Sequence, residues 1–122
     1  MFAVIGEALI DMVQPEPGLR FLAQPGGGPL NIAIGLQRLG HPTEMMARFS
    51  TGSLGGLVRH HAESNALGLS SSVWTHDPTT LAFATLDEEG RASYDFYTAG
   101  TADWGWTADE LGPMRNMAVF DN

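Results

Sequence analysis

The hydrophobic positions of this 122-residue chain fall into short apolar runs separated by polar, glycine-rich or proline-rich loops. Residues 2–5 form an apolar run of the length typical of a buried strand, and the run continues to Asp11 before a proline-rich loop at 15–18. Residues 21–23 and 43–49 form two further apolar runs. The pattern predicts a strand at each of these places.

Two segments have helical spacing instead. Ile32, Leu36 and Leu39 recur at intervals of three and four residues, and Gly40 is placed to end this helix in a left-handed conformation. Apolar positions between 57 and 62 predict a second helix that ends near residue 68. Strands that alternate with helices favour an α/β fold with a parallel sheet covered by helices.

The pattern changes in the last third of the chain. Residues 79–86 and 92–97 are two strand-like runs joined by a polar turn with a glycine, which predicts an antiparallel hairpin. Tyr94 and Phe96 would share one face of it, and Tyr97 would lie on the other. Such an aromatic face can be a lid over a ligand or a contact between subunits.

The final residues predict a short helix and the opening of another buried strand. Residues 107–110 have the spacing of a capping box, which marks a helix start, and residues 117–120 are apolar. A strand at a chain boundary needs neighbours, so we interpret the sequence as part of a larger fold or as a chain that a partner completes.

The glycine run Gly26-Gly27-Gly28 precedes Pro29 and Asn31 at the start of the first predicted helix. Glycines let backbone amides approach a ligand, and the amides at a helix start can hold an anion or several hydroxyl groups. The loop has no lysine and its glycines are contiguous, which argues against the usual nucleotide-binding loops. Asn31 adds two donors and an acceptor. A tight turn without a ligand is the alternative.

Asp11 is the second candidate. It is predicted to be an acid at the carboxyl end of the first strand, and ligands bind at that edge of open α/β sheets. The alternative is a solvated carboxylate at a strand end. The adjacent His60 and His61 lack the spacing of a metal pair, so no metal site is expected.

Composition limits the classes of molecule that this chain is expected to bind. A formal charge of -8 with only 6 Lys plus Arg argues against nucleic acid and acidic membranes. The absence of cysteine rules out disulfides and zinc–thiolate sites and fits a cytoplasmic location. We expect no signal peptide, because the start lacks a basic leader, and no membrane span, because no apolar run approaches roughly 18 residues. Hydrophobic residues make up 43% of the chain, enough for one small domain.

Three stretches in order, at 4–11, 26–40 and 79–104, resemble the amino-terminal part of the ribokinase or PfkB carbohydrate kinases, most of all the fructokinase branch. The resemblance implies an incomplete three-layer α/β/α fold with a parallel sheet and a small antiparallel β-lid. Residues 1–122 would be the N-terminal part of a single kinase domain. The lid hairpin would lie at about 79–98, and the C-terminal nucleotide-binding half would be absent.

The resemblance also implies a function, namely ATP-dependent transfer of phosphate to a sugar hydroxyl. The expected sugar-binding residues are Asp11, Gly26, Gly27 and Asn31, and the expected lid residues are Tyr94, Phe96 and Tyr97. ATP and Mg would serve the full-length parent, with neither bound to this fragment, and the catalytic residues would lie in the missing half. The partners implied are a small-molecule sugar and a second copy of the chain, through the lid or an exposed sheet edge.

Some positions depart from the family. Gly52 stands where the fructokinase branch commonly has an acid, and Leu9 stands where ribokinases have an asparagine, which disfavours ribose. Without the second half we expect this fragment alone to be inactive. Two alternatives stay open: a non-catalytic sugar-binding or dimerisation module, and a kinase of the same family that acts on 2-keto-3-deoxygluconate or a nucleoside.

Overall fold

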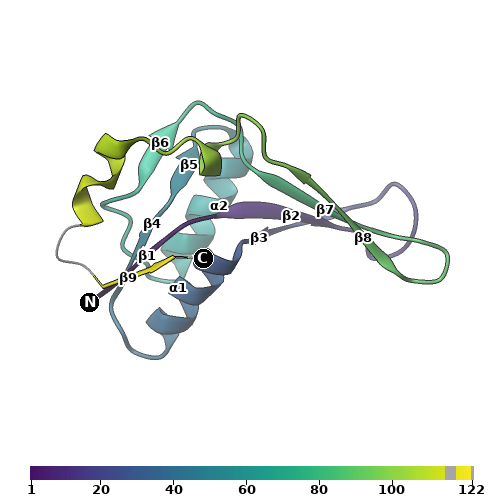
Figure 1. Cartoon of the computed structure of the whole chain (residues 1–122). Coiled ribbons are helices and arrows are strands. Elements are labelled where there is room, and N and C mark those ends of the chain that lie inside the picture. Colours follow the sequence, from purple (N-terminus) through teal and green to yellow (C-terminus); the bar gives the residue numbers. More distant parts are fainter. Residues whose placement is uncertain (115–117, 122) are drawn as a thin grey trace.

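The computed structural model describes residues 1–114 and 118–121 (Figure 1). The strands are β1 (Phe2–Ile5), β2 (Leu9–Val13), β3 (Leu22–Gly26), β4 (Thr43–Met46), β5 (Arg48–Ser50), β6 (Val73–Thr75), β7 (Leu81–Leu86), β8 (Ala92–Tyr97) and β9 (Ala118–Asp121). The α-helices are α1 (Gly28–Arg38) and α2 (Ser53–Ser64), and the 3-10 helices are η1 (Ala102–Trp104) and η2 (Ala108–Met114). Figure 1 shows a body that contains the helices and a long arm formed by β2, β3, β7 and β8.

The body is built on a parallel sheet of order β4-β1-β9. The predicted strand at 43–49 is two strands, β4 and β5, which Ala47 separates. β5 pairs in parallel with β6, which the sequence pattern did not predict because it has only three residues. The strand predicted at 117–120 corresponds to β9, and Met117 lies outside the described residues.

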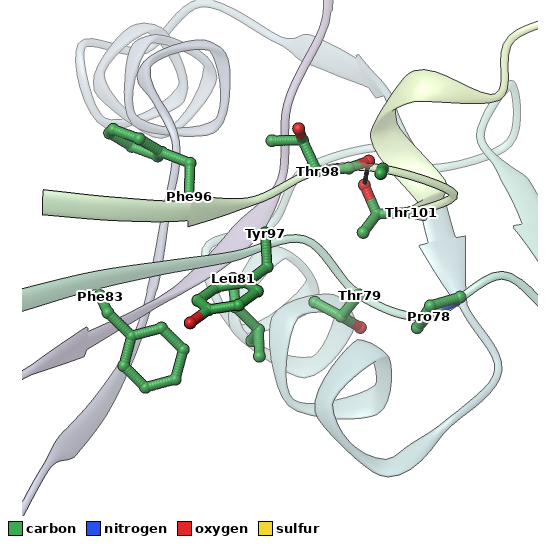
Figure 2. A pocket seen from close by; sticks show the side chains of 9 residues that line it. Pro78, Thr79, Leu81, Phe83, Phe96, Tyr97, Thr98 and Thr101 are labelled. Carbon is green, nitrogen blue, oxygen red and sulfur yellow. Dashed lines mark hydrogen bonds between the residues drawn. The ribbon is translucent and has the colours of Figure 1, made fainter.

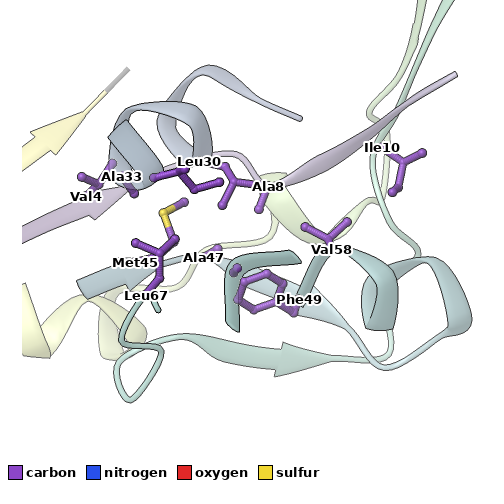
Figure 3. Packing of buried hydrophobic residues seen from close by; sticks show 12 residues of the cluster. Val4, Ala8, Ile10, Leu30, Ala33, Met45, Ala47, Phe49, Val58 and Leu67 are labelled. Carbon is purple, nitrogen blue, oxygen red and sulfur yellow. The ribbon is translucent and has the colours of Figure 1, made fainter. Parts of the chain in front are cut away.

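α1 packs against β1 and β4, α2 packs against β5, and the two helices contribute to one hydrophobic cluster (Figure 3). Val4 and Met45 are partners in the β1–β4 register and therefore point to the same side, and α1 and α2 contribute to the cluster around them. The buried side chains of the cluster include Val4, Leu30, Ala33, Ile34, Met45, Ala47, Phe49, Val58 and Ala62. Each large apolar side chain buried here contributes about 1.5–3 kcal/mol to stability.

The buried stripe of α1 differs from the predicted one. Leu30, Ala33 and Ile34 face the core, whereas Ile32 is 44% exposed and Leu39 77% exposed. Both stripes have helical spacing, and the one that is buried contains the small Ala33, which lets α1 approach β1 and β4 closely. The helix prediction itself is confirmed, as is the left-handed Gly40, whose φ is 90°.

The arm is a second sheet of order β3-β2-β7-β8. The predicted antiparallel hairpin is confirmed as β7 and β8, but β7 runs parallel to β2, so the arm sheet is mixed and not purely antiparallel. The prediction of one continuous strand from residue 2 to Asp11 is wrong. The chain leaves the first sheet at Gly6, whose φ of 148° suits glycine, and Asp11 lies in the middle of β2.

The α/β class with parallel and antiparallel strands is therefore as predicted. After β8 the chain returns to the body through η1 and η2. One half of the predicted capping box is present, because the Thr107 amide donates to Glu110 Oε1 at 2.9 Å, although the helix that follows is a 3-10 helix. Within the described residues, no helix combines the length and apolar character required to cross a membrane.

Candidate functional site

The Asp11 carboxylate lies on the surface of the arm sheet, next to the start of α1. Asp11 pairs with Gln24 on β3 and with Ala82 on β7. A β-carbon at Gly26 would overlap Asp11 Oδ2, so the carboxylate sits directly above the glycine backbone. Gly26 therefore leaves room for the Asp11 carboxylate, and the paired Ala82 places only a methyl group beside it.

The Asp11 carboxylate has no hydrogen-bond or ion-pair partner among the residues that the structure describes. Partial burial raises the pKa of this carboxyl above its usual value, because a charged group is less well solvated there. The pKa shift is a cost of folding that a hydrogen-bonding ligand would offset. Its oxygens are therefore available to accept hydrogen bonds from an incoming molecule.

The glycine run leads directly from β3 into α1. Gly27 is the N-cap residue and has a φ of 107°, and a β-carbon there would lie 2.8 Å from the Glu7 carbonyl oxygen. No side chain caps the helix, so amides of its first turn remain open. Asn31 is exposed in that first turn, where its backbone N–H donates to the Gly27 carbonyl at 3.0 Å. The structure thus brings Asp11, Gly26, Gly27 and Asn31 to one end of the arm sheet.

The expected lid residues divide between the two faces of the arm sheet. Phe96 pairs with Ala82, and Ala82 pairs with Asp11, so Phe96 shares the face of Asp11. Tyr94 stacks on Phe96 with ring centroids 6.5 Å apart, and both rings are about two-thirds exposed. Tyr97 points to the opposite face. Only Tyr94 and Phe96 can therefore cover a ligand held by Asp11 on this sheet.

The opposite face carries an open pocket of about 590 Å³ (Figure 2). Figure 2 shows Leu81, Phe83 and Tyr97 on one side of the two strands and Phe96 on the other. Phe83 contacts Tyr97 edge to face, with centroids 5.3 Å apart. The side chains of this pocket are mostly apolar, so it suits an apolar partner better than a polyol.

The site has a buried carboxylate behind it that the sequence pattern did not single out. Asp103 of η1 is only 7% exposed and accepts a hydrogen bond from the Ala8 amide at 3.1 Å. Its Oδ2 atom is buried without a hydrogen-bond partner among the described residues. Burial raises the pKa of Asp103 to about 6, although Thr80 and the Ala8 amide act in the opposite direction. Asp103 lies in one of the stretches that resemble the family, but its sequence neighbours give no signal for a buried acid.

Arg48 of β5 joins the segments that hold Asp103 in place. Its side chain is 7% exposed and binds both Glu110 oxygens at 2.6 Å, Asp77 Oδ2 at 3.1 Å and the Ala102 carbonyl at 2.8 Å. It therefore joins β5 to η1, to η2 and to the loop before β7. This network supports the site from behind and does not line it.

The arginine side chains of the described residues are paired with other side chains. Each arginine among the described residues has a carboxylate or amide partner; the pairs are Arg20–Glu16, Arg38–Asn65, Arg48–Glu110, Arg59–Glu63 and Arg91–Asp87. No group of three or more His, Asp or Glu side chains that could hold a metal is found in the described part of the chain. The described residues thus offer hydroxyl-binding groups and no cationic cradle for phosphates.

Comparison with known proteins identifies the family of this chain. Residues 1–120 match the family model described as pfkB family carbohydrate kinase. The chain is 32% identical over 124 residues to Fructokinase-2 of Zea mays, covering 94% of this chain and 37% of that protein. It is 35% identical over 105 residues to a fructokinase of Rhizobium leguminosarum bv. trifolii, covering 84% of this chain and 32% of that protein.

Solved structures give the same result. A crystal structure of fructokinase from Xylella fastidiosa with bound ATP superposes with a TM-score of 0.82 at 30% identity, covering 93% of this chain and 35% of that one. A PfkB protein from Polaromonas sp. JS666 superposes with a TM-score of 0.83 at 22% identity over 93% of this chain and 40% of that one, a likeness of fold. The chain therefore spans well under half the length of the relatives that it matches.

Proposed function

Because this chain belongs to the pfkB family of carbohydrate kinases, we propose that it is the sugar-binding and lid portion of an ATP-dependent kinase of the fructokinase type. The observation that carries the proposal is the Asp11 carboxylate, which has open acceptor positions directly above Gly26 at the start of α1. Fructose is the first sugar to test, because the relatives named above are fructokinases. The parent enzyme would phosphorylate a hydroxyl of that sugar.

The chemistry of the site suits a polyol. A carboxylate accepts hydrogen bonds from two adjacent hydroxyls, and the Asn31 amide can both donate and accept. Gly26 lets the Asp11 carboxylate lie directly above the backbone, and Gly27 lets the Glu7 carbonyl approach the start of α1, since a side chain at either position would collide with these groups. Asp11 and Asn31 would orient the sugar. Residues beyond this chain would carry out the phosphoryl-transfer step.

The arm sheet would act as the lid. Tyr94 and Phe96 present two stacked aromatic rings on the Asp11 face, and an aromatic ring packs well against the C–H surface of a sugar. Closure of this sheet over the sugar would exclude water, which competes with the sugar hydroxyl for the phosphoryl group. Tyr97, on the other face, is not part of this lid contact.

The residues described here do not fit ATP. A triphosphate needs cationic groups or a glycine loop with a lysine, whereas the buried Arg48 is fully engaged by Glu110 and Asp77 and the chain contains no lysine. We therefore assign ATP and Mg to the part of the parent that this chain lacks. The absence of cysteine agrees with a reducing compartment, so we propose a cytoplasmic enzyme.

The 122-residue chain is expected to transfer no phosphate on its own. A coupled assay for ADP release with fructose and Mg-ATP should give a rate no higher than buffer, because the nucleotide site is missing. The same gene read further downstream should encode the nucleotide-binding half of the family, and the longer protein should turn over fructose. Turnover by the short chain, or an unrelated downstream sequence, would reject the assignment.

The substitution Gly26→Ala is expected to weaken fructose binding by at least about tenfold, equivalent to about 1.4 kcal/mol, with little change in fold stability. The new methyl group would displace the flexible end of Asp11 and not the backbone. Gly35→Ala, at a helix position with open space around it, is the matched control. Calorimetric titration measures the affinities, and equal affinity of both variants would contradict the placement of Asp11 at the sugar.

A dimerisation module is the second candidate, and the apolar pocket favours it. Leu81, Phe83 and Tyr97 line an open surface on the face away from Asp11, and Tyr97 is 59% exposed. A second copy of the chain could cover this surface. Light scattering at increasing concentration should show a dimer that Phe83→Asp dissociates. A monomer at all concentrations would remove this candidate and leave the sugar site untouched.

A further inference from the structure

Asp103 connects η1 to the loop that joins the two sheets. Its Oδ1 atom accepts the Ala8 amide at 3.1 Å, although 95 positions separate the two residues along the chain. The Thr80 hydroxyl donates to Thr101 Oγ1 at 2.8 Å, and the Thr101 hydroxyl donates to the Thr98 carbonyl at 2.6 Å, which fixes the backbone next to Asp103. This carboxylate is therefore held in position by its own surroundings.

The loop at residues 6–8 lies between Asp103 and the start of α1. On one side, a β-carbon at Gly6 would overlap Pro29, and the Glu7 carbonyl closely approaches Gly27. On the other side, the Ala8 amide is held by Asp103. The loop continues directly into β2, where Asp11 is three residues from Ala8. Any shift of this loop changes where Asp11 stands relative to the first turn of α1.

We propose that Asp103 is a positioning residue of the sugar site: by holding the Ala8 amide, it seats the loop at 6–8 against α1 and sets the separation between Asp11 and Asn31. Asp103 does not itself contact the sugar. The proposal rests on the proposed sugar-binding function. It explains why a carboxylate is kept buried with one oxygen unpartnered among the described residues, a costly arrangement for a residue that only fills space.

The test uses the full 122-residue chain, ¹⁵N-labelled, with fructose as the probe. Asp103→Ala removes the acceptor, Asp103→Asn keeps an oxygen that can accept the Ala8 amide, and Asp109→Asn changes an exposed acid of η2 as a matched control. Two quantities are measured for each variant: the hydrogen-exchange rate of the Ala8 amide and the affinity for fructose. Circular dichroism at the titration temperature confirms that each variant is folded.

Asp103→Ala should speed Ala8 exchange and weaken fructose binding, each by at least about tenfold, whereas Asp103→Asn should restore both to within about threefold of the wild type. Fast Ala8 exchange with unchanged affinity would overturn the positioning role and leave the sugar site intact. Equal losses in Asp109→Asn would also overturn it, because the effect would not be specific. A wild-type chain that binds no fructose would overturn the proposed sugar site itself, and the positioning role with it.

Discussion

Replacing Arg48 with methionine is expected to lower the free energy of unfolding by about 2–3 kcal/mol, because the buried Ala102 loses the donor to its carbonyl and the partly exposed Asp77 and Glu110 carboxylates lose theirs. The Arg48 side chain is 7% exposed and bonds Glu110, Asp77, Thr75 and the Ala102 carbonyl. Methionine has a similar length but no donor, so the carbonyl and the carboxylates lose their hydrogen bonds.

Urea denaturation at neutral pH measures this effect. Arg20→Met is the control, because Arg20 and Glu16 form a pair in which both side chains are about two-thirds exposed, and such pairs contribute about 0–1 kcal/mol. A loss below about 1 kcal/mol for Arg48→Met would contradict the view that this residue joins β5 to η1 and η2. The m-value should stay unchanged if both variants keep a two-state transition.

The second large expected effect is a dependence of the free energy of unfolding on pH, caused by the titration of Asp103. Its pKa is raised to about 6 in the folded chain from 3.8, so the folded state holds this proton more tightly than the unfolded state. The stability gained from the neutral carboxyl is complete below about pH 3.8 and is lost as the pH rises through about 6. From the size of the shift, the loss amounts to about 3 kcal/mol.

The free energy of unfolding of the wild type should therefore fall relative to that of Asp103→Asn as the pH rises from 4 to 8. The comparison cancels the contributions of Asp11, whose pKa is also raised, and of Glu110, whose pKa is lowered mainly by the Thr107 amide. Asp109→Asn should run parallel to the wild type across the range. If the stability of Asp103→Asn also followed that of the wild type across this pH range, the view that Asp103 is buried and titrates near pH 6 would be contradicted.

Local patterns were enough to predict many of the elements. The glycine run with Pro29 predicted the start of α1, and the two runs around the turn at 87–91 predicted the hairpin, since both depend on neighbouring residues. Periodicity could not choose between two apolar stripes on α1, because both have helical spacing and only the sheet decides which is buried. The three-residue β6 was too short to give a pattern.

The residues of the candidate site could be named only in part from the sequence. Asp11, Gly26, Gly27 and Asn31 could be named from the glycine loop, an acid in an apolar run and the family resemblance. The position of Asp11 in the middle of β2 could not be predicted, because it depends on the switch of the chain from one sheet to the other at Gly6. Asp103 and Arg48 were missed for the same kind of reason: their partners Ala8 and Glu110 lie far away in the sequence, and only the fold brings them together.

The central claim is that a sugar binds where Asp11 meets the start of α1. Titration of fructose into the ¹⁵N-labelled chain, followed residue by residue through the amide chemical shifts, tests it most directly. The predicted result is saturable shifts concentrated at Asp11, Gly26, Gly27 and Asn31 that disappear in Asp11→Ala. Shifts confined to the opposite pocket around Phe83 and Thr98, or identical titrations for the wild type and Asp11→Ala, would contradict the claim.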